Sequence, residues 1–182
     1  ARVGAPRADQ HRIPDIDVTL ADGDHIQIGS LDFVTIETPG HTSGHVSFYC
    51  EDEKILFAGD TLFSLGCGRL FEGTAEQMWH SLSRLAALPD ETRLYCGHEY
   101  TLSNAKFAIK HDPDNVALRA RIAEAEALRA KGAFTLPSTI GREKATNPFL
   151  RAAEPALAAS VGRTGHKPVD VFAALREAKN KS

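Results

Sequence analysis

The chain has 182 residues, of which 42% are hydrophobic and 25% charged, and its formal net charge is -3. A chain of this length and composition can bury a sizeable core in one or two globular domains. The small net charge argues against a nucleic-acid-binding surface, and no apolar run approaches the roughly 20 residues of a membrane span.

The first half of the chain predicts short strands separated by turns. An early hairpin is expected around residues 26–31, after the turn at 21–24. Enrichment in β-branched and aromatic residues predicts further strands at 33–38, 46–50, 55–58 and 93–96. The segment 55–58 is almost entirely apolar, so we expect that strand to be buried on both faces.

One helix is predicted between the last two of these strands. Thr74 and Gln77 have the spacing of a capping box, in which each side chain bonds the backbone N–H of the other residue. Apolar residues then recur at helical spacing, at Met78, Leu82, Leu85 and Leu88. Strands interleaved with a helix predict an α/β layered domain.

The composition changes after residue 100 and becomes typical of helices. Asp112 followed by Pro113 predicts a helix start. That helix is expected to run to Lys131 and to end at Gly132. Two more helical segments are expected, near 154–161 and 168–179. We therefore predict a domain boundary near residue 100.

One local pattern recurs three times and carries the strongest functional signal. An apolar strand ends, a glycine follows, and a residue that can bind a metal comes next, as in Gly40–His41, Gly59–Asp60 and Gly97–His98. Glycine permits a sharp exit from a strand, and α/β folds bind ligands beyond the carboxyl ends of their strands. A single histidine in such a place is usually an ordinary surface or core residue. The threefold repetition favours a metal site, for which two imidazoles and a carboxylate suit Zn²⁺ or iron.

The remaining histidines and the cysteines carry weaker signals. His45 lies in a segment rich in Gly, Ser and Thr, and we interpret it as a structural residue or a support for the ligands. Surface or packing roles are expected for His11, His25, His80, His111 and His166. Three cysteines without a C-x-x-C pair are typical of reduced thiols in the cytoplasm: Cys50, Cys67 and Cys96.

The segments around the three candidate ligands resemble a known family. Residues 38–45 and 59–63 resemble the metallo-β-lactamase fold, and four further segments resemble hydroxyacylglutathione hydrolase, also called glyoxalase II: 66–74, 95–101, 136–139 and 147–151. The resemblance covers essentially the whole chain. It implies an α/β fold, a metallo-β-lactamase-type αββα sandwich that is N-terminally truncated, over residues 1–100. A smaller helical domain that binds glutathione would follow over residues 101–182.

The resemblance also implies a reaction and its cofactors. Two divalent metals would lie close together, as zinc, a zinc/iron mixture or manganese. Asp60 would bridge them, His41 would bind one and His98 the other, and a hydroxide between the metals would attack, so that no side chain acts as the nucleophile. The reaction implied is hydrolysis of S-D-lactoylglutathione to glutathione and D-lactate, in methylglyoxal detoxification. The expected protein is a cytoplasmic monomer whose partner is this small thioester, without nucleic-acid or membrane partners.

Glutathione recognition is implied for five residues: Arg69, Phe71, Tyr100, Arg176 and Lys179. Glutathione carries two carboxylates, so its site should be basic. Arg176 and Lys179 are three residues apart on a predicted helix and would share one face, as they also would on an ordinary solvated helix. The family often has tyrosine where this chain has Phe71, and the absent hydroxyl predicts modestly weaker binding or a changed pose.

One motif of the family, His-x-His-x-Asp-His, does not occur in this sequence. The opening residues 1–6 resemble the segment just downstream of that motif, so we expect a sequence that lacks the family's N-terminal part. Each metal would keep one histidine and a share of Asp60, which predicts weak metal binding and little or no thioesterase activity. An unpaired sheet edge and exposed core are also expected.

Two other functions remain open at this point. The chain could be another enzyme of the same fold, such as a single-iron persulfide dioxygenase or a lactonase. It could also be a non-catalytic remnant that binds glutathione-like anions. The segment 147–151 together with Arg176 and Lys179 favours the glutathione thioesterase.

Overall fold

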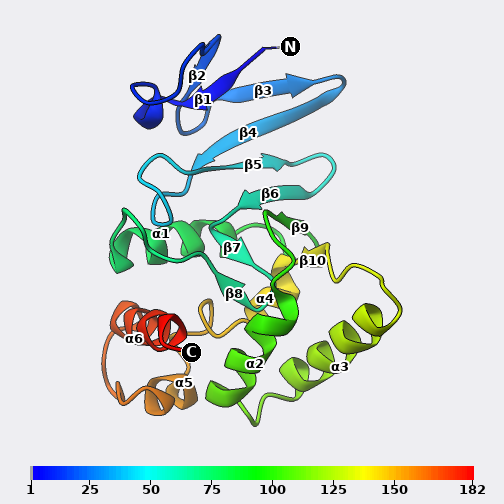
Figure 1. Ribbon diagram of the computed structural model, residues 1–182, viewed down its shortest axis with the longest axis vertical. Helices are drawn as coiled ribbons and strands as arrows, with labels where there is room; N and C mark the ends of the chain where they lie inside the picture. Colours follow the sequence, from blue (N-terminus) through cyan, green and yellow to red (C-terminus); the bar gives the residue numbers. More distant parts are fainter. Residues whose placement is uncertain (1) are drawn as a thin grey trace.

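The structure, a computed structural model, describes residues 2–182 and has a central sheet with most helices gathered at one end (Figure 1). The sheet has six strands in the order β10-β9-β6-β5-β4-β3. Their bounds are β3 His25–Ile28, β4 Leu31–Glu37, β5 Val46–Cys50, β6 Ile55–Gly59, β9 Arg93–Cys96 and β10 Ser138–Thr139. Neighbouring strands are antiparallel except β6 and β9, which are parallel. The carboxyl ends of β6 and β9 therefore meet at one edge of the sheet.

Two small pairs of strands accompany the sheet. β1 (Gly4–Pro6) and β2 (Val18–Leu20) are parallel, and a short 3-10 helix, Arg7–Asp9, follows β1. β7 (Leu62–Phe63) and β8 (Gly66–Cys67) form an antiparallel hairpin that leads away from the end of β6.

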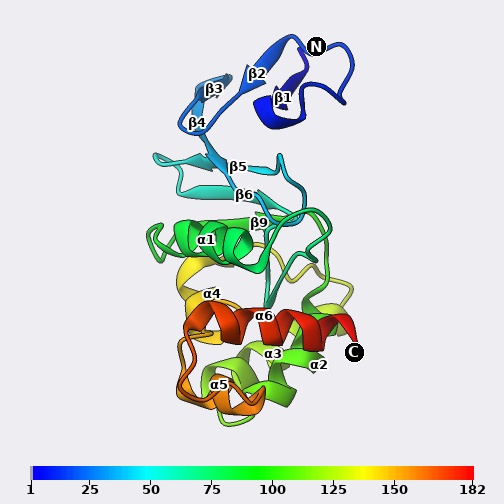
Figure 2. The same ribbon diagram turned by 90° about the vertical axis from the view of Figure 1, so that its left-hand side faces the viewer.

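Residues 2–182 contain six α-helices: α1 Ala75–Ala86, α2 Thr101–His111, α3 Val116–Ala130, α4 Ile140–Thr146, α5 Pro155–Ser160 and α6 Pro168–Asn180. Figure 2 shows α1 between the sheet and the C-terminal helices. The predicted capping box of α1 is present, with Thr74 as the N-cap and Gln77 bonded back to it. No helix in the described chain combines the length and the apolar character needed to cross a membrane.

The main apolar core joins the sheet to the C-terminal helices. It contains Leu56 of β6 and Met78 and Leu82 of α1, together with Phe149 and Phe172 from the second half of the chain. β10 also comes from the second half and pairs with β9. The two predicted domains thus share their packing, and the boundary near residue 100 stays a prediction.

The strand at residues 55–58 was expected to be buried on both faces, and this prediction is wrong. The side chain of Phe57 is 44% exposed, while its neighbours Leu56 and Ala58 are fully buried. Phe57 lies in a row with Phe33 and Tyr95, at ring-centroid distances of 5.8 and 5.5 Å. These rings stand on the outer face of the sheet, next to an apolar hollow of about 550 Å³ that includes Phe33 and Phe57. β3 forms one edge of the sheet.

The expected helix start at Asp112 is also wrong, because Asp112 ends α2. The Asp112 carboxylate is buried and accepts hydrogen bonds from Arg151 Nε and Asn115 Nδ2. Asn115 is the N-cap of α3, where its side chain accepts from the N–H of Leu118 at 3.0 Å. Helices α5 and α6 lie where they were predicted, whereas α2 and α4 were not predicted.

Candidate metal centre

The three residues that follow glycine-ended strands lie together in the structure. Asp60 comes directly after β6, His98 lies two residues after β9, and His41 lies on the loop that joins β4 to β5. His41 Nε2 is 3.5 Å from Asp60 Oδ2, and His98 Nε2 is 3.4 Å from Asp60 Oδ1. The two histidines thus flank the carboxylate, one at each oxygen.

Glycines surround Asp60 because its position leaves no room for side chains. A Cβ on Gly97 would lie 2.5 Å from Asp60 Oδ1, and a Cβ on Gly68 would collide with the Asp60 carbonyl oxygen. Gly59 has a φ of +49°, which glycine adopts without strain, and a Cβ there would meet the ring of His45. The three glycines therefore allow the chain to close around one carboxylate.

His45 supports Asp60 from behind. Its Nε2 accepts a hydrogen bond from the Asp60 backbone N–H at 3.0 Å. Its Nδ1 is 2.9 Å from Thr38 Oγ1 and 3.0 Å from Thr61 Oγ1. Burial lowers the pKa of His45, with a smaller contribution from His41 nearby, which favours a neutral ring. Because Nε2 is the acceptor, the proton of the neutral ring lies on Nδ1.

The two flanking histidines are oriented in different ways. His41 Nδ1 lies 2.8 Å from the Arg69 carbonyl oxygen, the type of contact that fixes a metal-binding ring. Within residues 2–182, no such bond fixes a ring nitrogen of His98. Its ring instead stacks on Tyr100 at 4.8 Å and lies 6.1 Å from the ring of Phe63.

The donor atoms fit a metal, although the ligand set is small. Asp60 Oδ1 is buried and has no hydrogen-bond partner within the described chain, a costly state for a carboxylate oxygen unless a cation satisfies it. Two ligands of a tetrahedral zinc ion, each about 2.1 Å from it, lie roughly 3.4 Å apart, close to both observed His–Asp separations. Among residues 2–182, however, no group of three or more His, Cys, Asp or Glu side chains could hold a metal ion. Asp60 therefore forms one pair with His41 and a separate pair with His98.

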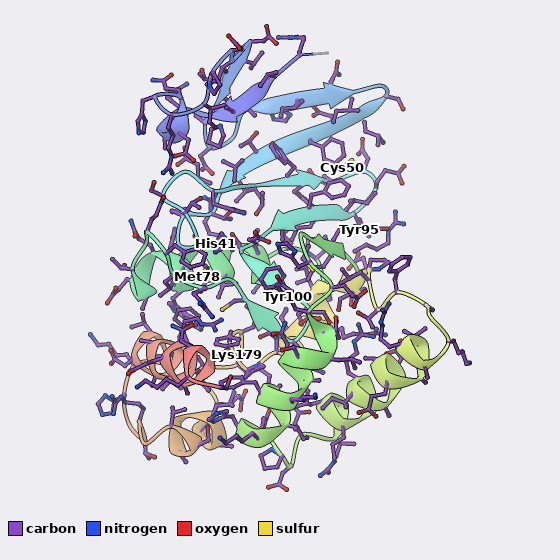
Figure 3. All side chains as sticks on the ribbon, in the orientation of Figure 1. His41, Cys50, Met78, Tyr95, Tyr100 and Lys179 are labelled. Atoms are coloured by element: carbon purple, nitrogen blue, oxygen red, sulfur yellow. The ribbon has the colours of Figure 1, made fainter. Side chains whose placement is uncertain are left out.

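A cavity of about 450 Å³ opens at this centre, between the sheet and the C-terminal helices. All five residues expected to recognise glutathione line it together with the three candidate ligands: His41, Asp60, Arg69, Phe71, His98, Tyr100, Arg176 and Lys179. Figure 3 labels three of them, His41, Tyr100 and Lys179, which come from a loop, the start of α2 and α6. The larger hollow on the outer sheet face is mainly apolar, so ionisable chemistry favours the smaller cavity as the site.

The basic residues of this cavity differ in how free they are. Arg69 is exposed, with its guanidinium 6.0 Å from the ring centre of Phe71. Arg176 is only 6% exposed, donates to the Cys67 carbonyl oxygen at 2.9 Å and lies over the ring of Phe149. Lys179 donates to the Ser103 carbonyl oxygen, and burial with the nearby Arg176 lowers its pKa. Arg176 thus acts partly as a structural residue, which the sequence did not indicate.

Sequence reasoning assigned no role to four other residues that line the cavity: Phe63, Cys67, Ser103 and Asn104. Phe63 belongs to a segment that was noted only for its resemblance, and Cys67 was noted only as one of three reduced thiols. No periodicity or spacing marks these residues, because the hairpin and α2 meet only in the folded chain.

Comparisons with known proteins agree over the whole chain. Residues 2–98 match the metallo-beta-lactamase superfamily, and residues 99–182 match the hydroxyacylglutathione hydrolase C-terminus. The hydroxyacylglutathione hydrolase of Rhodopseudomonas palustris (strain BisA53) is 56% identical over 181 residues, which cover 100% of this chain and 71% of that protein. That of Methylococcus capsulatus is 56% identical over 178 residues, covering 98% of this chain and 69% of that protein.

Solved structures show the same fold. The crystal structure of ETHE1 from Myxococcus xanthus matches with a TM-score of 0.65 at 27% identity, over 99% of this chain and 59% of that one. The BLEG-1 B3 metallo-beta-lactamase matches with a TM-score of 0.56 at 24% identity, over 82% of this chain and 65% of that one. The chain therefore spans only part of the length of the proteins it matches.

Proposed function

The chain belongs to the hydroxyacylglutathione hydrolase family of the metallo-beta-lactamase superfamily, and we propose that it acts in the hydrolysis of S-D-lactoylglutathione to glutathione and D-lactate. The family hydrolyses thioesters and, as its superfamily implies, uses divalent metal ions. One observation carries the proposal for this chain. The carboxylate shared by His41 and His98 opens into the same cavity as three basic side chains, Arg69, Arg176 and Lys179.

In this proposal, His41, Asp60 and His98 would hold divalent metal ions, with the Asp60 carboxylate available beside both histidines. Zinc, a zinc/iron mixture or manganese would suit these donors. When bound, the metals lower the pKa of a water molecule and polarise the thioester carbonyl. Asp60 would contribute a negative charge to the bound cations, and its buried oxygen Oδ1 would gain the partner that it lacks within residues 2–182.

The protein itself supplies no persuasive nucleophile, so water is the proposed attacking group. Cys67 is the thiol that lines the cavity, but burial raises its pKa to about 11, so it stays protonated near neutral pH. Hydrolysis breaks the thioester C–S bond, transfers the acyl group to a water oxygen and leaves glutathione as the thiol.

The basic residues would hold the glutathione part of the substrate. Arg69 is exposed at the mouth of the cavity and Lys179 is half-buried, so both can approach a carboxylate. Arg176 is less accessible and contributes mainly a fixed positive charge near Cys67. The rings of Phe71 and Tyr100 would cover the peptide-like body of the ligand. We also propose that the chain acts as a cytoplasmic monomer, and the free thiols of Cys50, Cys67 and Cys96 agree with a cytoplasmic setting.

A hydrolysis assay with added zinc tests the proposal. Each metal would have one histidine and a share of Asp60 from this sequence, whereas a catalytic zinc normally has three protein ligands. We therefore expect slow, zinc-dependent loss of the thioester that disappears in Asp60→Asn. Hydrolysis that persists with a chelator present, or that Asp60→Asn leaves unchanged, would contradict the proposal. Glutathione binding without turnover at any zinc concentration would instead support a chain that only binds glutathione.

A further inference from the structure

The turn between β7 and β8 is held by side chains from α4 and its C-terminal end. Asn147 Nδ2 donates to the carbonyl oxygens of Phe63 and Gly66, at 3.1 and 2.9 Å. The N–H of Leu65 donates to Glu143 Oε2 at 2.7 Å. These bonds fix three of the four residues of the turn to one short stretch of the chain.

The fourth residue of the turn, Ser64, is held by two other helices. Its carbonyl oxygen accepts from Asn104 Nδ2 of α2 at 3.0 Å. Its hydroxyl oxygen lies 3.3 Å from a guanidinium nitrogen of Arg121, which comes from α3. Every residue of the turn is therefore bonded to a side chain from the helical half of the molecule.

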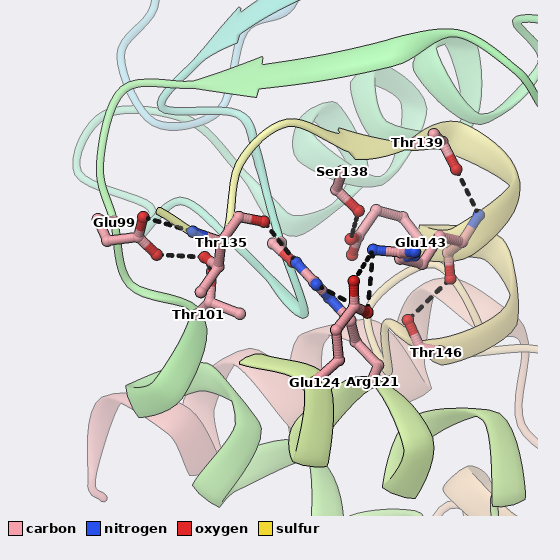
Figure 4. A network of polar contacts seen from close by, with 11 residues as sticks. Glu99, Thr101, Arg121, Glu124, Thr135, Ser138, Thr139, Glu143 and Thr146 are labelled. Atoms are coloured by element: carbon pink, nitrogen blue, oxygen red, sulfur yellow. Dashed lines mark hydrogen bonds and ion pairs between the residues drawn. The ribbon is translucent and has the colours of Figure 1, made fainter. Parts of the chain in front are cut away.

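Glu143 is the centre of this arrangement. It is fully buried and accepts a hydrogen bond from Ser138 Oγ at 2.5 Å (Figure 4). Besides the bond from Leu65, it also accepts one from Asn147 Nδ2 at 3.1 Å. Leu65 has a φ of +59°, a conformation that residues with side chains rarely adopt. The turn thus has a shape that its own sequence disfavours and that its bonds to the helices maintain.

The turn carries Phe63 to the metal centre. The ring of Phe63 packs edge-on against Tyr100 at 5.5 Å and lies 6.1 Å from His98. Unlike His41, whose Nδ1 contacts a carbonyl oxygen, His98 has no hydrogen bond to a ring nitrogen within the described chain. Its orientation depends on stacking with Tyr100 and on the nearby Phe63.

We propose that Glu143 is a positioning residue for the metal centre, acting through the turn and Phe63 to hold the ring of His98 beside Asp60. This inference rests on the proposed role of His98 as a metal ligand. It assigns to the helical half of the chain a second task besides binding glutathione, namely to fix the geometry of a ligand on the sheet. Side chains that orient metal ligands typically change metal affinity about 10- to 100-fold when removed.

The zinc affinity of the full 182-residue chain tests the inference. It is measured by competition with a chromogenic chelator at a temperature well below the onset of unfolding. We expect Glu143→Ala to weaken zinc binding about tenfold, the lower end of that range. Glu143→Gln should bind zinc like the unchanged chain, because its Oε1 can accept from Leu65 and Asn147 while its amide donates to Ser138. Leu157→Ala is the control: Leu157 is fully buried in the main core and belongs to none of these hydrogen bonds. It should lower stability without changing zinc affinity.

Phe63→Leu provides the second arm, since it leaves the buried polar groups intact and decides the matter if Glu143→Ala does not fold. It should weaken zinc binding to a similar extent. The double variant Glu143→Ala, Phe63→Leu should be no weaker than the weaker single variant, because both act on one contact. Unchanged zinc affinity in Phe63→Leu, or an equal loss in Leu157→Ala, would overturn the inference. If His98→Ala itself leaves zinc binding unchanged, the proposed function fails instead.

Discussion

A methyl group added at residue 97 tests whether the Asp60 carboxylate is placed for a metal. A Cβ on Gly97 would lie 2.5 Å from Asp60 Oδ1, whereas real Cβ contacts essentially never fall below 3.0 Å. In Gly97→Ala, the carboxylate or the backbone must therefore move by about half an ångström, a case of overpacking. Metal sites hold their ligand distances within roughly 0.2 Å. We expect zinc affinity to fall at least about tenfold, or ~1.4 kcal/mol.

The same methyl group also costs stability, about 1–3 kcal/mol for overpacking, so zinc affinity and unfolding need separate measurements. Gly4→Ala is the matched control, since its Cβ would meet Leu20 Cδ1 at 3.4 Å, an ordinary contact. Urea unfolding gives the stability of each variant, and chelator competition gives the zinc affinity of the folded protein. A Gly97→Ala chain that binds zinc as tightly as Gly4→Ala would refute the assignment of Asp60 Oδ1 as a ligand atom.

Three further predictions concern the surroundings of the centre. His45→Ala leaves the partly buried N–H of Asp60 without its acceptor, so urea unfolding should show a loss of about 1–3 kcal/mol. His45→Gln should lose less stability because its Oε1 can accept this hydrogen bond, and equal stabilities of the two variants would contradict the prediction. Lys179→Met should weaken glutathione binding about fivefold in calorimetry, which is ~1 kcal/mol for a partly exposed charge. The control Lys181→Met, at an exposed residue just beyond the same helix, should leave glutathione binding unchanged. Equal glutathione binding by the two variants would exclude Lys179 from the site. Burial raises the pKa of Glu143 above 4.5, so the folded chain binds this proton more tightly than the unfolded chain, and this contribution to stability is lost as the pH rises toward the raised pKa. Between about pH 4 and pH 8, the free energy of unfolding of Glu143→Gln should therefore rise relative to that of the unchanged chain. A difference that stays constant with pH would show that Glu143 does not titrate in this way.

Local sequence signals predicted the elements that local chemistry determines. Helix α1 has a capping box between Thr74 and Gln77, a signal within four residues, and was predicted at its observed start. Helix α2 begins at Thr101, and its N-cap residue Tyr100 makes no side-chain cap hydrogen bond, so no such signal marked the helix. Asp112 has the local appearance of a helix start, but its buried bond to Arg151 depends on the tertiary structure.

The burial of β6 shows a similar limit. An apolar run predicts a buried strand, but the sequence does not tell which of its two faces the rest of the chain covers. In the structure, the helices lie on the face of Leu56 and Ala58, and Phe57 stays exposed on the other.

The candidate metal centre could be predicted from the sequence because each candidate ligand follows a glycine at a strand end. That pattern named His41, Asp60 and His98, and the structure brings the three side chains together. The residues that support these side chains could not be predicted from the sequence, since Glu143 and Leu65 form a hydrogen bond across 78 positions of sequence. The buried position of Arg176 likewise depends on Phe149 and on the carbonyl group of Cys67.

Zinc binding by the 182-residue chain, compared with Asp60→Asn, His41→Ala and His98→Ala, tests the metal centre most directly. Equilibrium titration gives the affinity, and elemental mass spectrometry of the purified chain gives the number of metals retained. We predict weak zinc binding that each of the three substitutions weakens further. Two metals held tightly per chain, or zinc binding that survives Asp60→Asn unchanged, would contradict a centre built on these three residues.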